Sequence, residues 1–252
     1  MRTFRILLAK ELRAFFLSPV AYVVLALVML LNGVSFCVTI GFLQKGPSEV
    51  SLVSWTFTTF WFYLSYFAVF PLITMRLFAE EQKLGTLETL LTAPVRTTEM
   101  VLSKYFATVI FYCVLWLPSL ANFGIFQYIT KNMADLPAGQ LIGSYLIVFI
   151  MGLFNIAIGC FASSLTKNQI VAAITSFSMI LLHFLLGAFM FYLAGESHQQ
   201  YADLTTYFAS IVHFRTFTSG LIDSRPIIYY LSATFLILAF THQVLDFRRW
   251  KV

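Results

Sequence analysis

The sequence predicts an all-α protein that crosses a membrane six times. Of its 252 residues, 60% are hydrophobic and only 11% are charged, whereas a soluble globular domain carries about 25% charged residues. So few polar side chains could not cover a water-facing surface, so lipid must solvate much of the chain. A helical span requires about 20 apolar residues, because unpaired backbone groups in lipid cost several kcal/mol each. The stretches that meet this requirement are 19–43, 55–76, 103–130, 140–164, 169–194 and 226–247.

The distribution of basic residues predicts the orientation, since cytoplasmic connections are enriched in Lys and Arg. The leader, the connection between the second and third spans, the turn between the fourth and fifth, and the tail carry twelve basic residues, against four on the opposite side. We therefore expect both termini in the cytoplasm. The twelve are Arg2, Arg5, Lys10, Arg13, Arg76, Lys83, Arg96, Lys104, Lys167, Arg248, Arg249 and Lys251, and the four are Lys45, Lys131, Arg215 and Arg225.

Residues 2–17 have a helical period but carry too much charge to cross the membrane. Apolar side chains from Phe4 to Phe16 share one face, while the basic residues, including Arg5, Lys10 and Arg13, fall mostly on the other. This pattern is typical of a helix lying in the membrane interface, and Pro19 should separate it from the first span. The alternative is a charged leader that only sets topology. The first span is too long for a signal-peptide h-region, and no small-residue cleavage site follows it.

The cytoplasmic connection over residues 76–104 is far more polar than a short turn requires, and residues 78–94 form its informative part. Gly85 and Thr86 predict a break and a helix N-cap, and Pro94 predicts the end of a short helix. Such a helix either packs on the membrane surface or docks into a groove on a partner, and periodicity does not separate the two interpretations. The carboxylates of the connection are Glu80, Glu81, Glu88 and Glu99, and the leucines that share one helix face are Leu87, Leu90 and Leu91.

On the opposite side, residues 195–225 contain a helical pattern too short to cross, so we expect a short helix that caps the outer leaflet or dips into it. Its pattern consists of Ile211, Phe214, Phe217, Thr218 and Leu221. Possible metal ligands lie nearby, but at no metal-ligand spacing, so no metal is expected; these are His198, His213, Asp203 and Asp223.

Motifs for nucleotide binding and hydrolysis are absent from the sequence. It has no G-x-x-x-x-G-K-[ST], G-x-G-x-x-G or H-E-x-x-H, so we expect no cofactor in this chain, and ATP and Mg²⁺ would have to be bound by another subunit. A basic cluster for nucleic acid is also missing. The three cysteines, Cys37, Cys113 and Cys160, lie in apolar stretches without a motif spacing and are interpreted as packing residues.

Two polar side chains inside the predicted spans, Asn155 and His183, support a rival interpretation. Ionisable groups within a membrane are functional candidates, although Asn and neutral His often only join helices by hydrogen bonds. A stand-alone channel or secondary carrier would use these residues along its path. No Asp, Glu, Lys or Arg lies deep in a predicted span, which disfavours an ion-coupled carrier. A membrane-embedded enzyme lacks a candidate catalytic pair.

Three regions resemble the type-2 ABC transporter permeases, the ABC-2 family. Residues 10–16 with 18–22 are similar to the family's interfacial elbow helix and its entry into the first span. Residues 80–91, with Pro94 and Lys104, are similar to the family's E-x-x-x-G-T-x-E-x-L-L…P region, which in the family contacts the ATPase. The third region resembles the gliding-motility-associated branch through His213, Phe214, Phe217, Gly220, Ile222, Asp223, Arg225, Tyr229, Tyr230, Leu231, Ser232, Arg248, Arg249 and Trp250.

The resemblance implies one permease domain over 1–252 in a bacterial cytoplasmic membrane. It would pair with a second copy or a homologous permease and bind cytoplasmic ABC ATPase subunits. The complex would export a substrate or do mechanical work on an extracytoplasmic partner, accompanied by an extracytoplasmic auxiliary protein. Arg5, Lys10 and Arg13 would belong to an elbow helix that transmits tilt to the first span. The ATPase-docking residues would be Glu80, Glu81, Gly85, Thr86, Leu87, Glu88, Leu90, Leu91 and Pro94.

Overall fold

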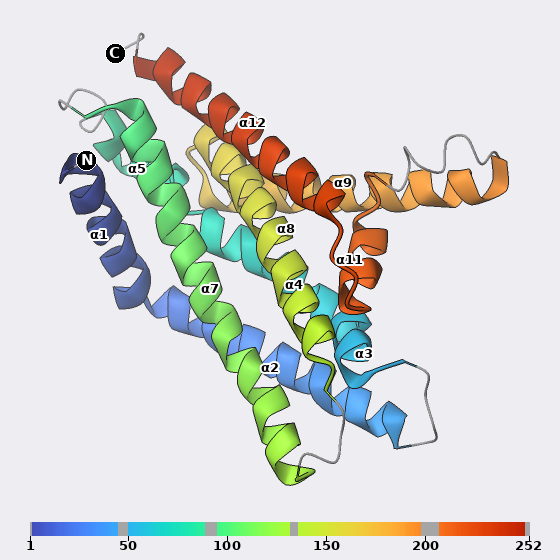
Figure 1. The fold of residues 1–252 in the computed structure, drawn as a ribbon. Coiled ribbons are helices and arrows are strands. Elements are labelled where there is room, and N and C mark those ends of the chain that lie inside the picture. Colours follow the sequence, from blue (N-terminus) through green and yellow to red (C-terminus); the bar gives the residue numbers. More distant parts are fainter. Residues whose placement is uncertain (1, 45–49, 89–94, 132–135, 198–206, 250–252) are drawn as a thin grey trace.

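The computed structural model describes residues 2–44, 50–88, 95–131, 136–197 and 207–249, and this part of the chain is helical, with no strand. Figure 1 shows the arrangement of its helices. Their bounds are α1 Arg2–Leu17, α2 Pro19–Leu43, α3 Leu52–Thr58, α4 Phe60–Thr74, α5 Ala79–Leu84, α7 Thr97–Ile129, α8 Ala138–Leu165, α9 Gln169–Ser197, α11 Ser210–Thr218 and α12 Ser224–Arg249.

Six helical segments are long and apolar enough to cross a membrane, which confirms the predicted fold class. They are α2, the segment Phe60–Leu84 that contains α4 and α5, α7, α8, α9 as far as Met190, and α12. The two ends of the chain lie at the same end of the bundle, beside α5 (Figure 1). This placement agrees with an even number of crossings.

The central helix of the bundle is α8, of whose most apolar window 78% is buried, against 17% for α12. Glycines let its neighbours approach closely. A Cβ on Gly143 would lie 2.3 Å from the carbonyl oxygen of Phe217 in α11, and one on Gly152 would lie 2.4 Å from the ring of Tyr112 in α7. These contacts require a hydrogen in place of a methyl group, so the glycines of α8 set the distance to α7 and α11.

The predicted second span, 55–76, is wrong as a single helix. The structure has two helices, α3 and α4, separated at Thr59, whose backbone is extended (φ −69°, ψ 153°). The Thr59 hydroxyl accepts a hydrogen bond from the backbone N–H of Phe62 at 3.2 Å, and so caps α4. The Ser35 hydroxyl of α2 donates to the carbonyl of Thr56 at 2.9 Å. These two hydroxyl groups therefore satisfy backbone C=O and N–H groups that lose their helical partners at the break. A hydropathy average does not detect such a break.

The third span begins six residues earlier than predicted, because α7 starts at Thr97 rather than at 103. Lys104 thus lies inside a helix and is 2% exposed, rather than standing in a polar connection. The other spans differ from the predicted bounds by three residues or fewer at each described end. Of the cysteines, Cys160 is buried as predicted, whereas Cys37 and Cys113 face outward, so their interpretation as packing residues is wrong.

The segment before the last span contains one described helix, α11, shorter than the predicted pattern. Gly220 takes a left-handed backbone (φ 89°), and the helix ends before it, so Leu221 lies outside. Phe214 and Phe217 are fully buried, so α11 packs into the bundle against α8, α3 and α9. The predicted positions His198 and Asp203 lie outside the described residues.

Residues 2–17 form α1, as predicted, and the chain turns at Ser18 so that Pro19 begins α2. Proline suits this first helical position because its missing N–H would have no partner there. Aromatic contacts fix α1 on α7: Phe15 stacks on Phe111 with ring centroids 5.0 Å apart, and Phe4 meets Phe106 edge to face at 6.4 Å. Arg5, Lys10 and Arg13 are exposed.

Candidate functional site

The candidate site is the set of bonds that surrounds α5, where the chain leaves the bundle and turns back. Gly85 follows α5 in a left-handed conformation (φ 72°), which only glycine adopts without strain. The predicted break at Gly85 is therefore confirmed. Residues 86–88 are helical again. Thr86 lies inside this turn rather than before it, and its hydroxyl donates to the carbonyl of Glu81 at 3.3 Å, so its interpretation as an N-cap is wrong.

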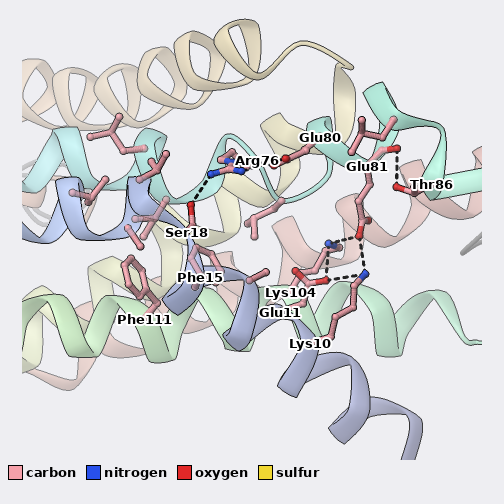
Figure 2. A pocket seen from close by; sticks show the side chains of 18 residues that line it. Lys10, Glu11, Phe15, Ser18, Arg76, Glu80, Glu81, Thr86, Lys104 and Phe111 are labelled. Atoms are coloured by element: carbon pink, nitrogen blue, oxygen red, sulfur yellow. Dashed lines mark hydrogen bonds and ion pairs between the residues drawn. The ribbon is translucent and has the colours of Figure 1, made fainter.

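A cluster of two carboxylates and two lysines joins α5 to α1 and α7, and Figure 2 shows these side chains pointing toward one another. The Lys104 ammonium lies 3.0 Å from Glu11 Oε1 and 3.0 Å from Glu81 Oε1. Lys10 is 3.4 Å from the same Glu81 oxygen and 3.8 Å from Glu11 Oε1. The Lys104 ammonium also lies 5.5 Å from the centre of the Phe78 ring. Burial makes the pairing of Lys104 with Glu11 and Glu81 obligatory, because any of these three left alone would be a largely buried charge without compensation.

A second ion pair links the start of α5 to the first span. The Arg76 guanidinium donates to both oxygens of Glu80, at 2.8 Å and 3.2 Å, and to the hydroxyl of Ser18 at 2.9 Å (Figure 2). Ser18 is the residue between α1 and α2. The turn after α4 is therefore bonded to the point where the elbow helix meets the first span.

The opposite side of α5 is bonded to α8 and α12. The Gln82 amide donates to the carbonyl of Ser164 at 3.0 Å and accepts a hydrogen bond from Arg248 in α12. The Ser163 hydroxyl of α8 accepts from the backbone N–H groups of Phe78 and Ala79, at 3.0 Å and 3.1 Å. One helix of six residues thus contacts α1, α7, α8 and α12 through its polar side chains.

The predicted docking residues divide into three groups. Glu80 and Glu81 have partners within the chain, and Leu87 is 3% exposed, so these side chains do not form a free surface. Gly85, Thr86 and Glu88 are exposed. The remaining predicted residues, Leu90, Leu91 and Pro94, lie outside the described part of the chain.

The predicted pathway residues are engaged by tyrosine hydroxyls. Asn155 is 3% exposed and donates to Tyr66 at 3.0 Å. The His183 ring nitrogen Nε2 lies 3.0 Å from the hydroxyl of Tyr229, and the imidazole packs against Phe154 at 4.8 Å between ring centroids. These contacts are of the kind that joins helices. Among the described residues, no group of three His, Cys, Asp or Glu is arranged to hold a metal ion.

Sequence reasoning missed the internal partners of the acidic residues. Glu11 is the only acidic residue of α1 and Lys104 the only basic residue inside α7 after its first turn. A single acidic residue among the bases of α1 and a single lysine in the apolar part of α7 are the signal that could have paired them. The roles of Arg76, Gln82 and Arg248 depend on tertiary contacts and had no such signal.

The six membrane-length helices define a multi-pass membrane protein. The family model described as "ABC-2 family transporter protein" matches residues 17–183, well over half of the chain. The chain therefore belongs to the ABC-2 family, whose members are membrane permeases. A search of curated proteins found no match. The match ends before α11 and α12, so assignment to the gliding-motility branch stays a prediction.

Proposed function

We propose that this chain is the membrane subunit of an ATP-driven complex in the cytoplasmic membrane, and that residues 85–94 dock a separate ABC ATPase subunit. Membership of the ABC-2 family supports an ATPase partner, since the family consists of permease subunits. ATP and Mg²⁺ belong to that partner. Both termini and α5 lie at one end of the bundle (Figure 1), and the twelve basic residues expected there support a cytoplasmic position for this end.

The observation that carries the proposal is the position of α5, a six-residue helix bonded to α1, α7, α8 and α12. The docking segment follows α5 directly at Gly85. A displacement of that segment by the ATPase would therefore be imposed on four helices at once. Leu87 anchors the segment to the fold, while Glu88 is exposed and free to face a basic group on the partner.

One acceptor in the charged cluster has no partner, and a second arrangement of the helices around it would supply one. Glu81 Oε1 is shared by both lysines, whereas Glu81 Oε2 is buried with no hydrogen-bond partner among the described residues. A buried acceptor without a partner costs about 1–3 kcal/mol. A modest tilt of α1 or α5 that supplies this oxygen with a donor would recover that free energy, so the cluster suits a junction with two states.

The complex would contain a second copy of this chain or a homologous permease, and an extracytoplasmic auxiliary protein. Its work would be export or mechanical force on an extracytoplasmic partner, as in gliding motility. The rival class, a stand-alone channel or carrier, is less well supported because Asn155 and His183 are bonded to Tyr66 and Tyr229 rather than aligned along an open path.

The exposed residue Glu88 provides the test. The chain and its ATPase are co-expressed and purified together in mild detergent, and Glu88→Arg should lower recovery of the ATPase about tenfold. Placing like charges opposite one another at an interface costs up to several kcal/mol, and a tenfold loss of affinity corresponds to about 1.4 kcal/mol. Thr98→Arg is the matched control, since Thr98 is an exposed residue outside the docking segment. It should recover the ATPase fully.

Thermal unfolding should be unchanged in both variants, because neither side chain is buried. Full recovery of the ATPase with Glu88→Arg would contradict docking at this segment. Equal loss in both variants would show that any added arginine at this end weakens the complex, and would contradict the assignment to residues 85–94.

A further inference from the structure

A cavity of about 350 Å³ lies between α1, α2, the end of α4, α5 and α7. It is bounded on one side by the elbow helix and on the other by the first turns of the first span. Its volume is at the lower end of the range for small-molecule sites, about 300–1,000 Å³. Exposed residues among those that line it, Ala14, Val20 and Leu84, show that the cavity opens to the surroundings of the protein.

The lining is amphiphilic. Figure 2 shows Phe15 and Phe111 toward one end of the cavity and the side chains of Lys10, Glu11 and Lys104 toward the other. Further apolar lining comes from Val24, Leu72 and Ile73. A ligand that fits both ends must have a hydrocarbon part and a charged part.

The accessible charge in this cavity is positive. The Glu11 and Glu81 side chains are only 11% and 15% exposed, whereas Lys10 is 59% exposed. The contacts of the Lys10 ammonium, at 3.4 Å and 3.8 Å, are long for charge-assisted hydrogen bonds.

Arg76 lines the same cavity beside Ser18, away from Lys10 (Figure 2). Its hydrogen bonds to Glu80 and Ser18 use three of the five N–H groups of a guanidinium. Glu80 is as exposed as Arg76, but both its oxygens already accept from that guanidinium. Glu81 Oε2 has no hydrogen-bond partner but is buried, so the unused groups on the more exposed side chains, Lys10 and Arg76, are donors, which favours an anionic head group.

We propose that this cavity binds an anionic phospholipid of the cytoplasmic leaflet. Its phosphate lies at Lys10, at the charged end of the cavity, and the first part of one acyl chain lies against Phe15, Val24 and Phe111. The rest of the lipid extends past Ala14 and Val20 into the bilayer. The site does not depend on the docking of an ATPase. A lipid bound here fills the space between the elbow helix and the first span.

The test uses the full-length chain, freed of lipid in a neutral detergent and titrated with phosphatidylglycerol or phosphatidylcholine of identical acyl chains. Native mass spectrometry counts the bound lipids. Phosphatidylglycerol should bind at one site about tenfold more tightly, a difference of about 1.4 kcal/mol, because the choline cation of phosphatidylcholine offsets its phosphate and is repelled by Lys10. Lys10→Gln should remove most of this preference, while Lys104 still pairs Glu11 and Glu81.

Ala14→Trp tests the cavity without changing a charge, since Ala14 is an exposed lining residue whose enlarged side chain would occupy the opening. Ala9→Trp is the matched control, on an exposed position of the same helix that does not line the cavity. The high-affinity lipid should be lost with Ala14→Trp and retained with Ala9→Trp.

Three results would overturn the proposal: equal affinity for the two lipids in the unmodified chain, retention of the preference with Ala14→Trp, or loss with both tryptophan variants. Glycerol phosphate, which has the phosphate but no acyl chain, should compete at least a hundredfold more weakly than the lipid. Equal competition would mean that the site binds phosphate alone, and would contradict the role of the apolar end.

Discussion

At the scale of single residues, Lys104 is the side chain on which the junction around α5 depends most. It is 2% exposed, and its ammonium lies 3.0 Å from both Glu11 and Glu81. No other cation lies as close to either carboxylate among the described ion pairs. Removing the lysine would leave two buried carboxylates with only the longer contacts to Lys10.

We expect Lys104→Met to lower the free energy of unfolding by about 3–5 kcal/mol, because breaking a buried ion pair from one side leaves charge without compensation. Denaturant unfolding in detergent would measure the loss. The control is Lys83→Met, at an exposed position of α5, which should change stability by less than about 0.5 kcal/mol.

The triple variant Lys104→Met, Glu11→Gln, Glu81→Gln separates charge from packing. Because no charge is then left unpaired, it should recover most of the stability lost by Lys104→Met alone. A triple variant no more stable than the single one would mean that lost packing of the lysine stem, rather than unpaired charge, causes the defect.

At the scale of helices, the glycines of α8 decide how closely its neighbours pack. Gly143→Ala should destabilise the fold by about 1–3 kcal/mol, because the added methyl would meet the Phe217 carbonyl at 2.3 Å and backbone atoms cannot move aside as a flexible side chain can. Thermal unfolding would measure the shift.

Gly33→Ala in α2 is the control for this substitution, since a Cβ there meets nothing within 4 Å. Alanine in a helix interior should be neutral or stabilising there by about 0.5–1 kcal/mol. If Gly143→Ala were equally harmless, the close approach of α11 to α8 would not be needed for stability.

The helices themselves were largely predictable, because long apolar runs and a charged leader are properties of consecutive residues. Residues 19–43 coincide with α2 and residues 2–17 with α1. The prediction failed at Thr59, where a hydroxyl group caps a new helix in the middle of an apolar stretch. Hydropathy does not distinguish a threonine that continues a span from one that interrupts it.

The candidate site was predictable only in part, for a related reason. The polar connection identified Glu80, Glu81 and Gly85, and the left-handed turn at Gly85 follows from its residue type. The partners of Glu80 and Glu81 come from positions 10, 76 and 104. Those pairings depend on how α1 and α7 pack, which no local pattern encodes.

At the scale of the whole molecule, the described ion pairs gather at one end and the core of packed aromatic side chains lies along the bundle. The junction at α5 is reinforced by Thr97 at the start of α7, whose hydroxyl donates to Asp246 near the end of α12 at 2.8 Å. The starts and ends of five helices are thus tied together where both termini lie (Figure 1). Force applied at this end would act on the bundle as a unit.

The orientation of the bundle is the last prediction, and it rests on the asymmetry of basic residues and on this common end. In a cysteine-free background, with Cys37, Cys113 and Cys160 replaced, single cysteines at Glu88 and Arg249 should react with a membrane-impermeant maleimide only after the cytoplasmic side is opened. Cysteines at Tyr128 and Tyr207, both exposed at the other end of their segments, should react in intact cells.

Labelling of all four positions in detergent is the control for reactivity. The four positions test two spans separately. Glu88 and Tyr128 flank the third span, while Tyr207 and Arg249 flank the last one. Reaction of Tyr207→Cys only from the cytoplasm, with Tyr128→Cys reacting from outside, would mean that α8 or α9 does not cross the membrane. An even number of crossings would then fail, and the two termini would lie on opposite sides.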